Sequence, residues 1–260
     1  MNLFVFDIET VPDVDAGRRL YDLGELPDAQ VAEIMFHKQR ELSGNDFLRH
    51  HLHRVVAISV VLRSADRFKL WSLGDPSSPE EELIQRFFDG LERYSPTLVS
   101  WNGSGFDLPV LHYRSLLHGI VAHRYWETGA DDSSFRWNNY LSRFHERHTD
   151  LMDVLAGHQP RAGVALQDMA LLLGLPGKLS MHGSLVWERY LDGAIASIRN
   201  YCETDVLNTF LVYLRFELVR GRLTEEAYER ECERLRAALE EDGRSHIAEF
   251  LAAWSDGRSS

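Results

Sequence analysis

Carboxylates occur near the start of this chain in a spacing that could hold metal ions. Asp7 and Glu9 stand two residues apart in the segment Phe6-Asp7-Ile8-Glu9-Thr10. Side chains alternate along a strand, so both acids would project from one face and could reach a common pair of ions. A single pair of this kind is more often a solvated pair of polar side chains. The segment therefore indicates a metal site only if other acids join it.

A second candidate lies at residues 102–107, with the sequence Asn-Gly-Ser-Gly-Phe-Asp. The glycines allow the backbone to approach a ligand closely. Asp107 stands at the expected start of a helix, where backbone N–H groups stabilise an anion, so we expect its pKa to stay low. A simple N-cap role would also explain Asp107. The two glycines complete neither a dinucleotide fingerprint nor a Walker loop.

A third candidate pairs a phenol with a carboxylate. Tyr201 and Asp205 stand four residues apart in the strongly periodic segment Ile195–Val219. They would share one helical face and address the same point. Together the three segments place four acids on elements that a mixed sheet with flanking helices can bring together. Such a cluster requires cations to offset its charge.

The elements that must position these residues follow an α/β pattern. Strands are predicted at Asn2–Ile8, Arg54–Arg63, Phe68–Leu73 and Thr97–Trp101. Helices are predicted at Ala29–Gln39, Glu80–Tyr94, Asp107–His118, Asp150–Leu155, Leu166–Leu173, Leu185–Leu191, Ile195–Val219, Glu225–Glu241 and Ser245–Trp254. The polar stretches Leu42–His53 and Gly119–His148 lack a periodic pattern and are predicted as loops.

The composition is that of an ordinary globular protein with an acidic surface. Of the 260 residues, 44% are hydrophobic and 26% are charged. Two cysteines, Cys202 and Cys232, favour a reducing compartment over a disulfide framework. No segment has the length of a membrane span or the pattern of a signal peptide, so we expect a cytoplasmic location.

The net charge of -12 argues against tight, non-specific binding of nucleic acid. Two features weaken that objection. The segment from Leu223 to the end has ten acidic and five basic side chains, so it carries a large part of the negative charge. Bound cations would also neutralise the clustered acids. A weak grip on one strand end would suit such a surface.

In this order, the three segments resemble the motifs of the DEDD superfamily of 3′→5′ exonucleases, in its tyrosine-bearing branch. The other branch has a histidine five residues before the last aspartate, where this chain has Asn200. Within the branch, the chain is similar to the proofreading domain of B-family DNA polymerases, and most similar to the stand-alone exonucleases related to it. The segments His53–Ser59 and Leu173–Lys178 share this likeness, which covers roughly residues 1–216.

The resemblance implies a ribonuclease H-like α/β fold with a mixed five-stranded sheet flanked by helices. We expect an exonuclease domain at residues 1–220 and an acidic helical appendage at residues 221–260. The implied reaction is hydrolysis of phosphodiester bonds at single-stranded 3′ ends, with DNA favoured over RNA. The implied cofactors are two divalent cations, Mg²⁺ or Mn²⁺, about 3.5–4 Å apart. No membrane is involved, and no protein partner follows from the sequence.

The resemblance also implies roles for individual side chains. Asp7 would bridge both ions, Glu9 and Asp205 would bind the ion on the nucleophile side, and Asp107 would act mainly through water. Tyr201 would orient the attacking water, because a phenol with a pKa near about 10 is a poor base at neutral pH. The residues expected to contact nucleic acid are Thr10, Asn102, Phe106 and Lys178.

Other interpretations stay open. An exoribonuclease on the same fold is the nearest alternative, because the contacts that would recognise a 2′-OH cannot be located. A non-catalytic nucleic-acid-binding module also fits, as does a phosphoesterase acting on small nucleotides. The histidines His50, His51 and His53 are expected in a basic surface patch, and Asp150 is expected as a helix N-cap.

Overall fold

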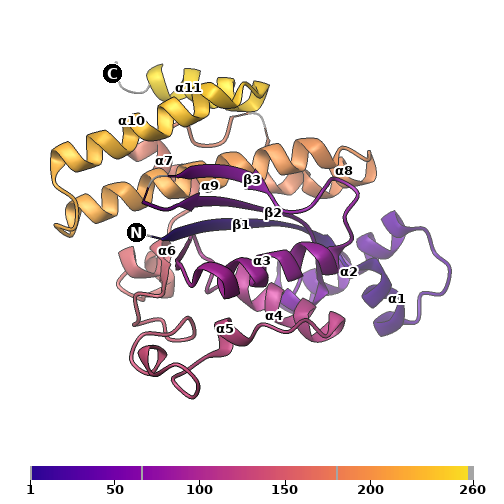
Figure 1. Cartoon of the computed structure of the whole chain (residues 1–260). Helices are drawn as coiled ribbons and strands as arrows, with labels where there is room; N and C mark the ends of the chain where they lie inside the picture. The colour runs from indigo at the N-terminus through magenta and orange to yellow at the C-terminus, as the bar shows by residue number, and fades with distance from the viewer. Residues whose placement is uncertain (1, 66, 180, 257–260) are drawn as a thin grey trace.

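A computed structural model describes residues 2–65, 67–179 and 181–256 of the chain. Its centre is one mixed sheet in the order β3-β2-β1-β4-β5 (Figure 1). The strands are β1 (Leu3–Pro12), β2 (His53–Arg63), β3 (Phe68–Ser72), β4 (Thr97–Ser100) and β5 (His148–Asp150). β2 is antiparallel to β1 and β3, whereas β4 is parallel to β1 and β5. The sheet confirms the predicted fold class.

Helices cover both faces of the sheet. On one face lie α3 (Glu80–Tyr94), α4 (Asp107–His118) and α5 (His123–Trp126). On the other lies α9 (Ile195–Val219), with α10 (Glu225–Asp242) and α11 (Ser245–Asp256) packed outside it (Figure 1). The remaining helices are α1 (Val14–Tyr21), α2 (Asp28–Ser43), α6 (Leu151–Leu155), α7 (Leu166–Leu172) and α8 (Val186–Leu191). Within the described ranges, no helix is long and apolar enough to cross a membrane.

The alternation of side chains along β1 divides the core in two. Leu3 and Val5 belong to the cluster that contains α9, whereas Phe4 and Phe6 belong to the cluster that contains α3 and α4. The period of two along a strand then decides where later side chains point. Asp7 follows Val5 in this series, so the first acid faces α9, the helix that bears the third predicted segment.

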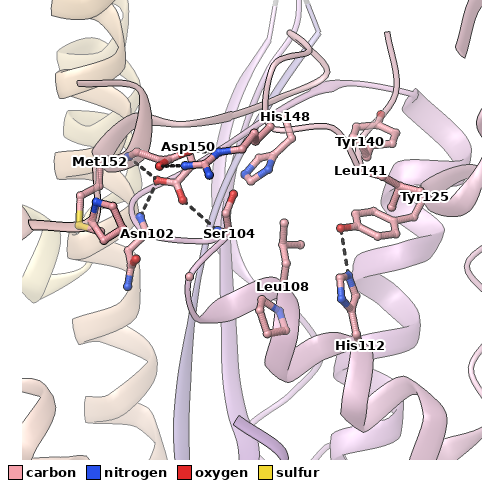
Figure 2. Close-up of a pocket in the computed structure, with 15 residues that line it drawn as sticks. Asn102, Ser104, Leu108, His112, Tyr125, Tyr140, Leu141, His148, Asp150 and Met152 are labelled. Atoms are coloured by element: carbon pink, nitrogen blue, oxygen red, sulfur yellow. Dashed lines mark hydrogen bonds and ion pairs between the residues drawn. The ribbon is translucent and has the colours of Figure 1, made fainter. Parts of the chain in front are cut away.

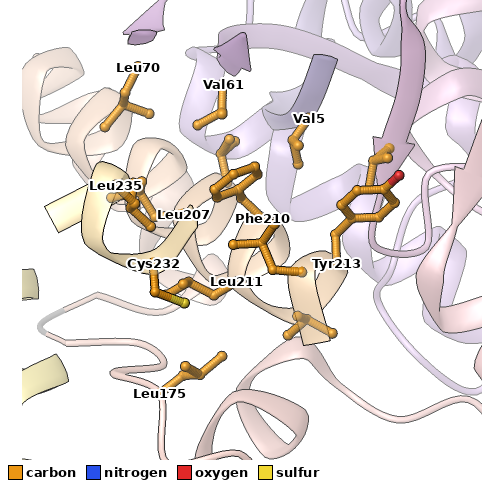
Figure 3. Packing of buried hydrophobic residues seen from close by; sticks show 14 of the residues in the cluster. Val5, Val61, Leu70, Leu175, Leu207, Phe210, Leu211, Tyr213, Cys232 and Leu235 are labelled. Carbon is orange, nitrogen blue, oxygen red and sulfur yellow. The ribbon is translucent and has the colours of Figure 1, made fainter. Parts of the chain in front are cut away.

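α9 is buried along most of its length because the sheet packs on one side and the C-terminal helices pack on the other. Every side chain from Leu207 to Leu214 is buried. Phe210 lies at the centre of a cluster that joins Val5 of the sheet to Cys232 of α10 (Figure 3). α9 is thus buried on all sides along this stretch and lies at the centre of the core, between the sheet and the C-terminal helices.

The C-terminal helices share this core. Phe250 and Trp254 of α11 are buried in the same cluster as α9. The guanidinium of Arg63, at the end of β2, donates two hydrogen bonds of 2.7 Å to Glu231 of α10. The division into residues 1–220 and 221–260 stays a proposal, and its first residue and last four residues lie outside the described ranges.

Some predicted boundaries are wrong. β1 does not end at Ile8 but continues to Pro12, because it keeps pairing with β2 beyond a register shift between Glu9 and Thr10. The two acids of the first segment therefore lie inside the strand. The fifth strand falls partly in a segment predicted as loop, and helix α1 was not predicted. In contrast, the predicted bounds of α3, α4 and α9 agree with the structure.

We expect Phe250→Ala to lower the free energy of unfolding by about 3–5 kcal/mol, because it deletes a buried ring from the core around α9. Urea unfolding followed by circular dichroism would measure the change. A single transition is expected, because the C-terminal helices and the sheet share one cluster. Phe144→Ala is the control, because Phe144 is 75% exposed. Two separate transitions, with the sheet unaffected by the change, would contradict a shared core.

Candidate active site

The first and second acidic segments are joined by one hydrogen bond. Parallel pairing of β1 with β4 ends at Val5 and Val99, so β1 runs past the end of its neighbour. Beyond that point the backbone N–H of Ile8 donates to Oδ1 of Asp107 at 3.2 Å. The carboxylate of Asp107 thus takes the place of a strand-to-strand hydrogen bond beyond the end of the β1–β4 pairing. This bond holds the start of α4 against β1.

The third segment approaches β1 from α9. The thiol of Cys202 donates to the carbonyl oxygen of Asp7 at 3.4 Å and lies 3.6 Å from Oδ2 of the same residue. Carboxylate oxygens of Asp7 and Glu9 and the sulfur of Cys202 all lie within 4.8 Å of one another. Asp107 and Asp205 line a cavity of about 410 Å³ together with Asp7. The structure therefore brings the four acids of the three segments together.

Burial raises the pKa of all four carboxyls, and neighbouring acids add to the shift of Asp7 and Glu9. Burial raises the pKa of Asp7 well above its ordinary value, and the charges of Asp107 and Asp205 raise it further. The pKa of Glu9 is raised in the same way, by burial and then by Asp7. Burial raises the pKa of Asp107 to about 7 and that of Asp205 to about 6. Uncompensated negative charge is thus costly at this place.

The expectation of a low pKa for Asp107 is wrong for the metal-free protein. Its carboxyl does accept backbone hydrogen bonds, including the one from Ile8, and these lower the pKa. Burial outweighs them, because Asp107 is only 4% exposed. The sequence shows the position at the helix start, but it does not show the depth of burial.

The cluster fits divalent cations by its chemistry. Oδ1 of Asp205 is buried and has no hydrogen-bond partner among the described residues, so this oxygen is available to bind a cation. All four side chains offer carboxylate oxygen, which Mg²⁺ and Mn²⁺ prefer. Cys202 does not suit a ligand role. Burial raises the pKa of its thiol well above the ordinary range, and the thiol donates to the carbonyl of Asp7.

Tyr201 and Lys178 complete the surroundings of the acids. Nζ of Lys178 lies 5.3 Å from the centroid of the Tyr201 ring. Lys178 also lines the cavity of the acids, and its charge lowers the pKa of Asp7 and Asp205. Burial, and then the charges of the nearby carboxylates, raise the pKa of the Tyr201 phenol above its ordinary range. The phenol is therefore protonated at neutral pH and can donate a hydrogen bond.

Two of the other three residues predicted to contact nucleic acid lie at the same cavity. Asn102 and Phe106 line it. Thr10 lies further along β1, and its hydroxyl forms a hydrogen bond of 2.8 Å with Nδ1 of His53. His53 is buried, and burial lowers its pKa to about 4. The prediction that His53 belongs to a basic surface patch is therefore wrong.

Asp150 is a supporting residue whose full role was not predicted. It caps α6, as expected, and accepts a hydrogen bond from the backbone N–H of Asp153 at 3.3 Å. Its carboxylate also accepts hydrogen bonds of 2.9 Å from the N–H groups of Asn102 and Ser104 (Figure 2). Asn102 has a φ of 63°, a conformation that is unusual for a residue other than glycine. Asp150 thus stabilises the turn that carries the second segment.

Glu203 is a second supporting residue that sequence reasoning missed. It lies on α9 between Cys202 and Asp205, yet its side chain binds elsewhere. It accepts hydrogen bonds from the hydroxyl of Ser72 at 2.8 Å, from Arg244 at 2.6 Å and from His246 at 2.9 Å. The residue is 2% exposed. It therefore ties the face of α9 opposite the acids to β3 and to the C-terminal helices.

These features define an α/β protein with a buried carboxylate cluster beside the central strand. Residues 45–254 match the family described as "predicted 3′-5′ exonuclease related to the exonuclease domain of PolB". The chain belongs to this family, which confirms the predicted relationship. The match begins after the first acidic segment. The assignment of Asp7 and Glu9 to the candidate site therefore rests on their spacing and on the geometry, and not on the family match.

Two polymerases are similar to parts of the chain. DNA polymerase 1 from Sulfurisphaera ohwakuensis is 32% identical over 96 residues, which are 36% of this chain and 10% of the polymerase. The family B DNA polymerase from the hyperthermophilic archaeon Pyrobaculum calidifontis is 18% identical, with a TM-score of 0.49, over 84% of this chain and 24% of that chain. The chain thus covers only a small part of the length of either polymerase.

We expect Asp7→Asn to raise the melting temperature of the metal-free protein, because it removes one charge from the crowded cluster. Melting in EDTA at pH 7.5 would measure a gain of about 2–4 °C for each kcal/mol of relieved repulsion. In the wild-type protein, Mn²⁺ should raise the melting temperature, and Asp7→Asn should lose most of that gain.

The sign of the pH dependence follows from the same pKa shifts. Asp107 and Asp205 have folded-state pKa values of about 7 and about 6, above those of the unfolded chain. Their destabilising effect is fully present at high pH and declines as the pH falls through these values. The stability of the wild-type protein in EDTA should therefore rise between pH 7.5 and pH 5.5. Glu33→Gln, at an exposed carboxyl of α2, is the control. Equal melting behaviour of Asp7→Asn and this control would contradict a repulsive cluster.

Proposed function

We propose that this chain is a metal-dependent 3′→5′ exonuclease that hydrolyses phosphodiester bonds at single-stranded 3′ ends, with DNA favoured over RNA. The observation that carries the proposal is a cluster of four carboxylates from three distant segments. Asp7, Asp107 and Asp205 line one cavity with Lys178, a carboxylate oxygen of Glu9 lies within 4.8 Å of one of Asp7, and Tyr201 lies beside Lys178. Membership of an exonuclease family supports the reaction class. The likeness to a DNA polymerase supports the choice of DNA. The cytoplasmic location stays a prediction from the sequence.

The four acids would bind the metal ions, and their neighbours would position the acids. Asp7, Glu9, Asp107 and Asp205 would hold two Mg²⁺ or Mn²⁺ ions. Bound there, the ions would supply an activated water and stabilise charge on the leaving 3′ oxygen. Cys202 and Ile8, which bond to the first two acidic segments, would keep the acids in place without touching the substrate.

Tyr201 and Lys178 would act on the water and on the phosphate. Because the phenol of Tyr201 is protonated at neutral pH, it would orient the attacking water by hydrogen bonding and would not accept its proton. Lys178 is the cation among the described residues that line the cavity, so it would attract the scissile phosphate. Asn102 and Phe106, which line the cavity, would contact the nucleotide at the strand end, and Thr10, further along β1, would contact it as well.

Asp7→Ala should abolish cleavage, because Asp7 would bridge both ions and its loss would disrupt both metal sites. The assay is digestion of 5′-labelled single-stranded DNA and RNA of equal sequence with Mg²⁺ or Mn²⁺, and with EDTA as a control. The wild-type protein should give a ladder that shortens from the 3′ end, faster on DNA. Glu33→Gln should behave like the wild type. An Asp7→Ala protein with wild-type activity would refute the proposed site.

Tyr201→Phe should reduce kcat by about 10- to 1000-fold, the range expected for a group that positions a proton-bearing reactant. The change keeps the ring, and with it the contact to Lys178. KM should change little, because the hydroxyl acts on water and not on the strand. Tyr94→Phe, at the partly exposed end of α3, is the matched control. A fully active Tyr201→Phe protein would remove the phenol from the mechanism.

A further inference from the structure

An exposed aromatic ring stands beside the candidate active site and has no part in the proposed chemistry. Phe47 follows α2, and 59% of the residue is exposed. The next residue, Leu48, is buried in the small core formed with α1 and α2. A hydrogen bond of 3.0 Å from the backbone N–H of Phe47 to Oδ1 of Asn45 fixes the turn between helix and core. The chain thus holds this ring at the surface in a defined place.

Phe47 belongs to a group of rings that reaches the cavity of the acids. Its centroid lies 5.4 Å from that of Phe106 and 5.4 Å from that of buried His53. The ring of His50 lies 5.8 Å from Phe106, and its Nε2 forms a hydrogen bond of 2.8 Å with the carbonyl of Gly105. Phe106 in turn lines the cavity and precedes Asp107. We call Phe47, His50 and Phe106 the aromatic rim.

The rim is held by packed structure. Val31, Met35, Leu48 and Leu52 form the small core beneath it. α1 packs closely against α2, since a Cβ added at Gly17 would come within 2.4 Å of Sδ of Met35. The backbone N–H of Asp13 donates to the carbonyl of Leu52 at 2.8 Å, which ties this lobe to the end of β1. Side chains positioned in this way can bind a ligand with little loss of conformational freedom.

An aromatic rim could add affinity for nucleic acid that the acidic surface does not supply. With a net charge of -12 the protein has little general attraction for phosphate, and Lys178 is the one cation among the described residues lining the cavity. A flat aromatic ring binds a nucleobase without needing charge. Stacking of this kind contributes about 5- to 150-fold in affinity per base and accepts all bases, because each has a π face.

We propose that Phe47 and His50 form, with Phe106, a stacking subsite for the unpaired nucleobase at the 3′ end of the strand. The inference rests on the proposed function. A base in a duplex is already stacked and paired, so it cannot lie on the rim without being pulled out. The subsite therefore selects single-stranded ends through the base, independently of the sugar and of the sequence.

The test compares Phe47→Ala and Phe47→Tyr on two single-stranded DNA oligonucleotides. One is intact, and the other lacks the base of its 3′-terminal nucleotide. Binding of 5′-fluorescein-labelled strands is measured by fluorescence anisotropy in EDTA, where no cleavage is expected, and KM and kcat are measured with Mg²⁺. Trp137→Ala, which removes an aromatic side chain that is 82% exposed, is the control. Melting temperatures check that each variant is folded.

With the intact strand, Phe47→Ala should raise Kd and KM by about 5- to 150-fold and leave kcat within about twofold. Phe47→Tyr should keep the wild-type values, because it keeps the ring. With the strand that lacks the terminal base, the wild-type protein and Phe47→Ala should bind equally weakly.

An equal loss of affinity on both strands, or no loss in Phe47→Ala, would overturn the subsite. The two proposals fail in different ways. If the wild-type protein cleaves neither strand, the proposed exonuclease activity fails, while the anisotropy comparison still decides whether Phe47 binds the terminal base. If cleavage is normal and the Phe47 variants do not differ, the subsite alone fails.

Discussion

Mutual repulsion among four buried carboxylates is the constraint that the rest of this structure has to meet. The pKa of each carboxyl is raised by burial, and for Asp7 and Glu9 by neighbouring acids as well. A fold optimised for stability alone would not place these groups together. The surrounding hydrogen bonds therefore satisfy the carboxylates only in part. The thiol of Cys202 donates to the carbonyl of Asp7, the N–H of Ile8 occupies one carboxylate oxygen of Asp107, and Oδ1 of Asp205 has no hydrogen-bond partner among the described residues.

The geometry that assembles the cluster follows from two simple periods. Because side chains alternate along β1, Asp7 and Glu9 point to the face covered by α9. Leu3 and Val5 point to the same face earlier in the strand and pack in the core. A period of 3.6 along α9 brings Tyr201 and Asp205 to one side of the helix and leaves Glu203 on the other. Glu203 then binds Ser72, Arg244 and His246, which fixes the rotation of α9 about its axis. The C-terminal helices thus help to orient the third acidic segment without approaching the acids.

The sequence predicted what depends on neighbours in the chain and missed what depends on neighbours in space. The bounds of α3 and α4 could be predicted because Pro79 precedes one helix and Gly119, with a φ of 67°, ends the other. β5 could not, since three residues are too few to show a pattern and the strand forms only by pairing with β4. In the candidate site, the pairing of Asp7 with Glu9 followed from spacing. The raised pKa of Asp107 and the support from Asp150 did not, because both arise from contacts with segments far away in the chain.

An acidic protein that acts on an acidic polymer must obtain its affinity from something other than a basic surface. Among the described residues that line the cavity Lys178 is the one cation, so attraction for phosphate there depends on Lys178 and on any cations held at the carboxylates. Aromatic surface lies next to that cavity, where the ring of Phe106 contacts the rings of Phe47 and His50. Under the proposed function, this arrangement would favour a strand end over a strand interior. An end would place a phosphate at the acids and a free base on the rings without bringing further phosphates across the acidic surface.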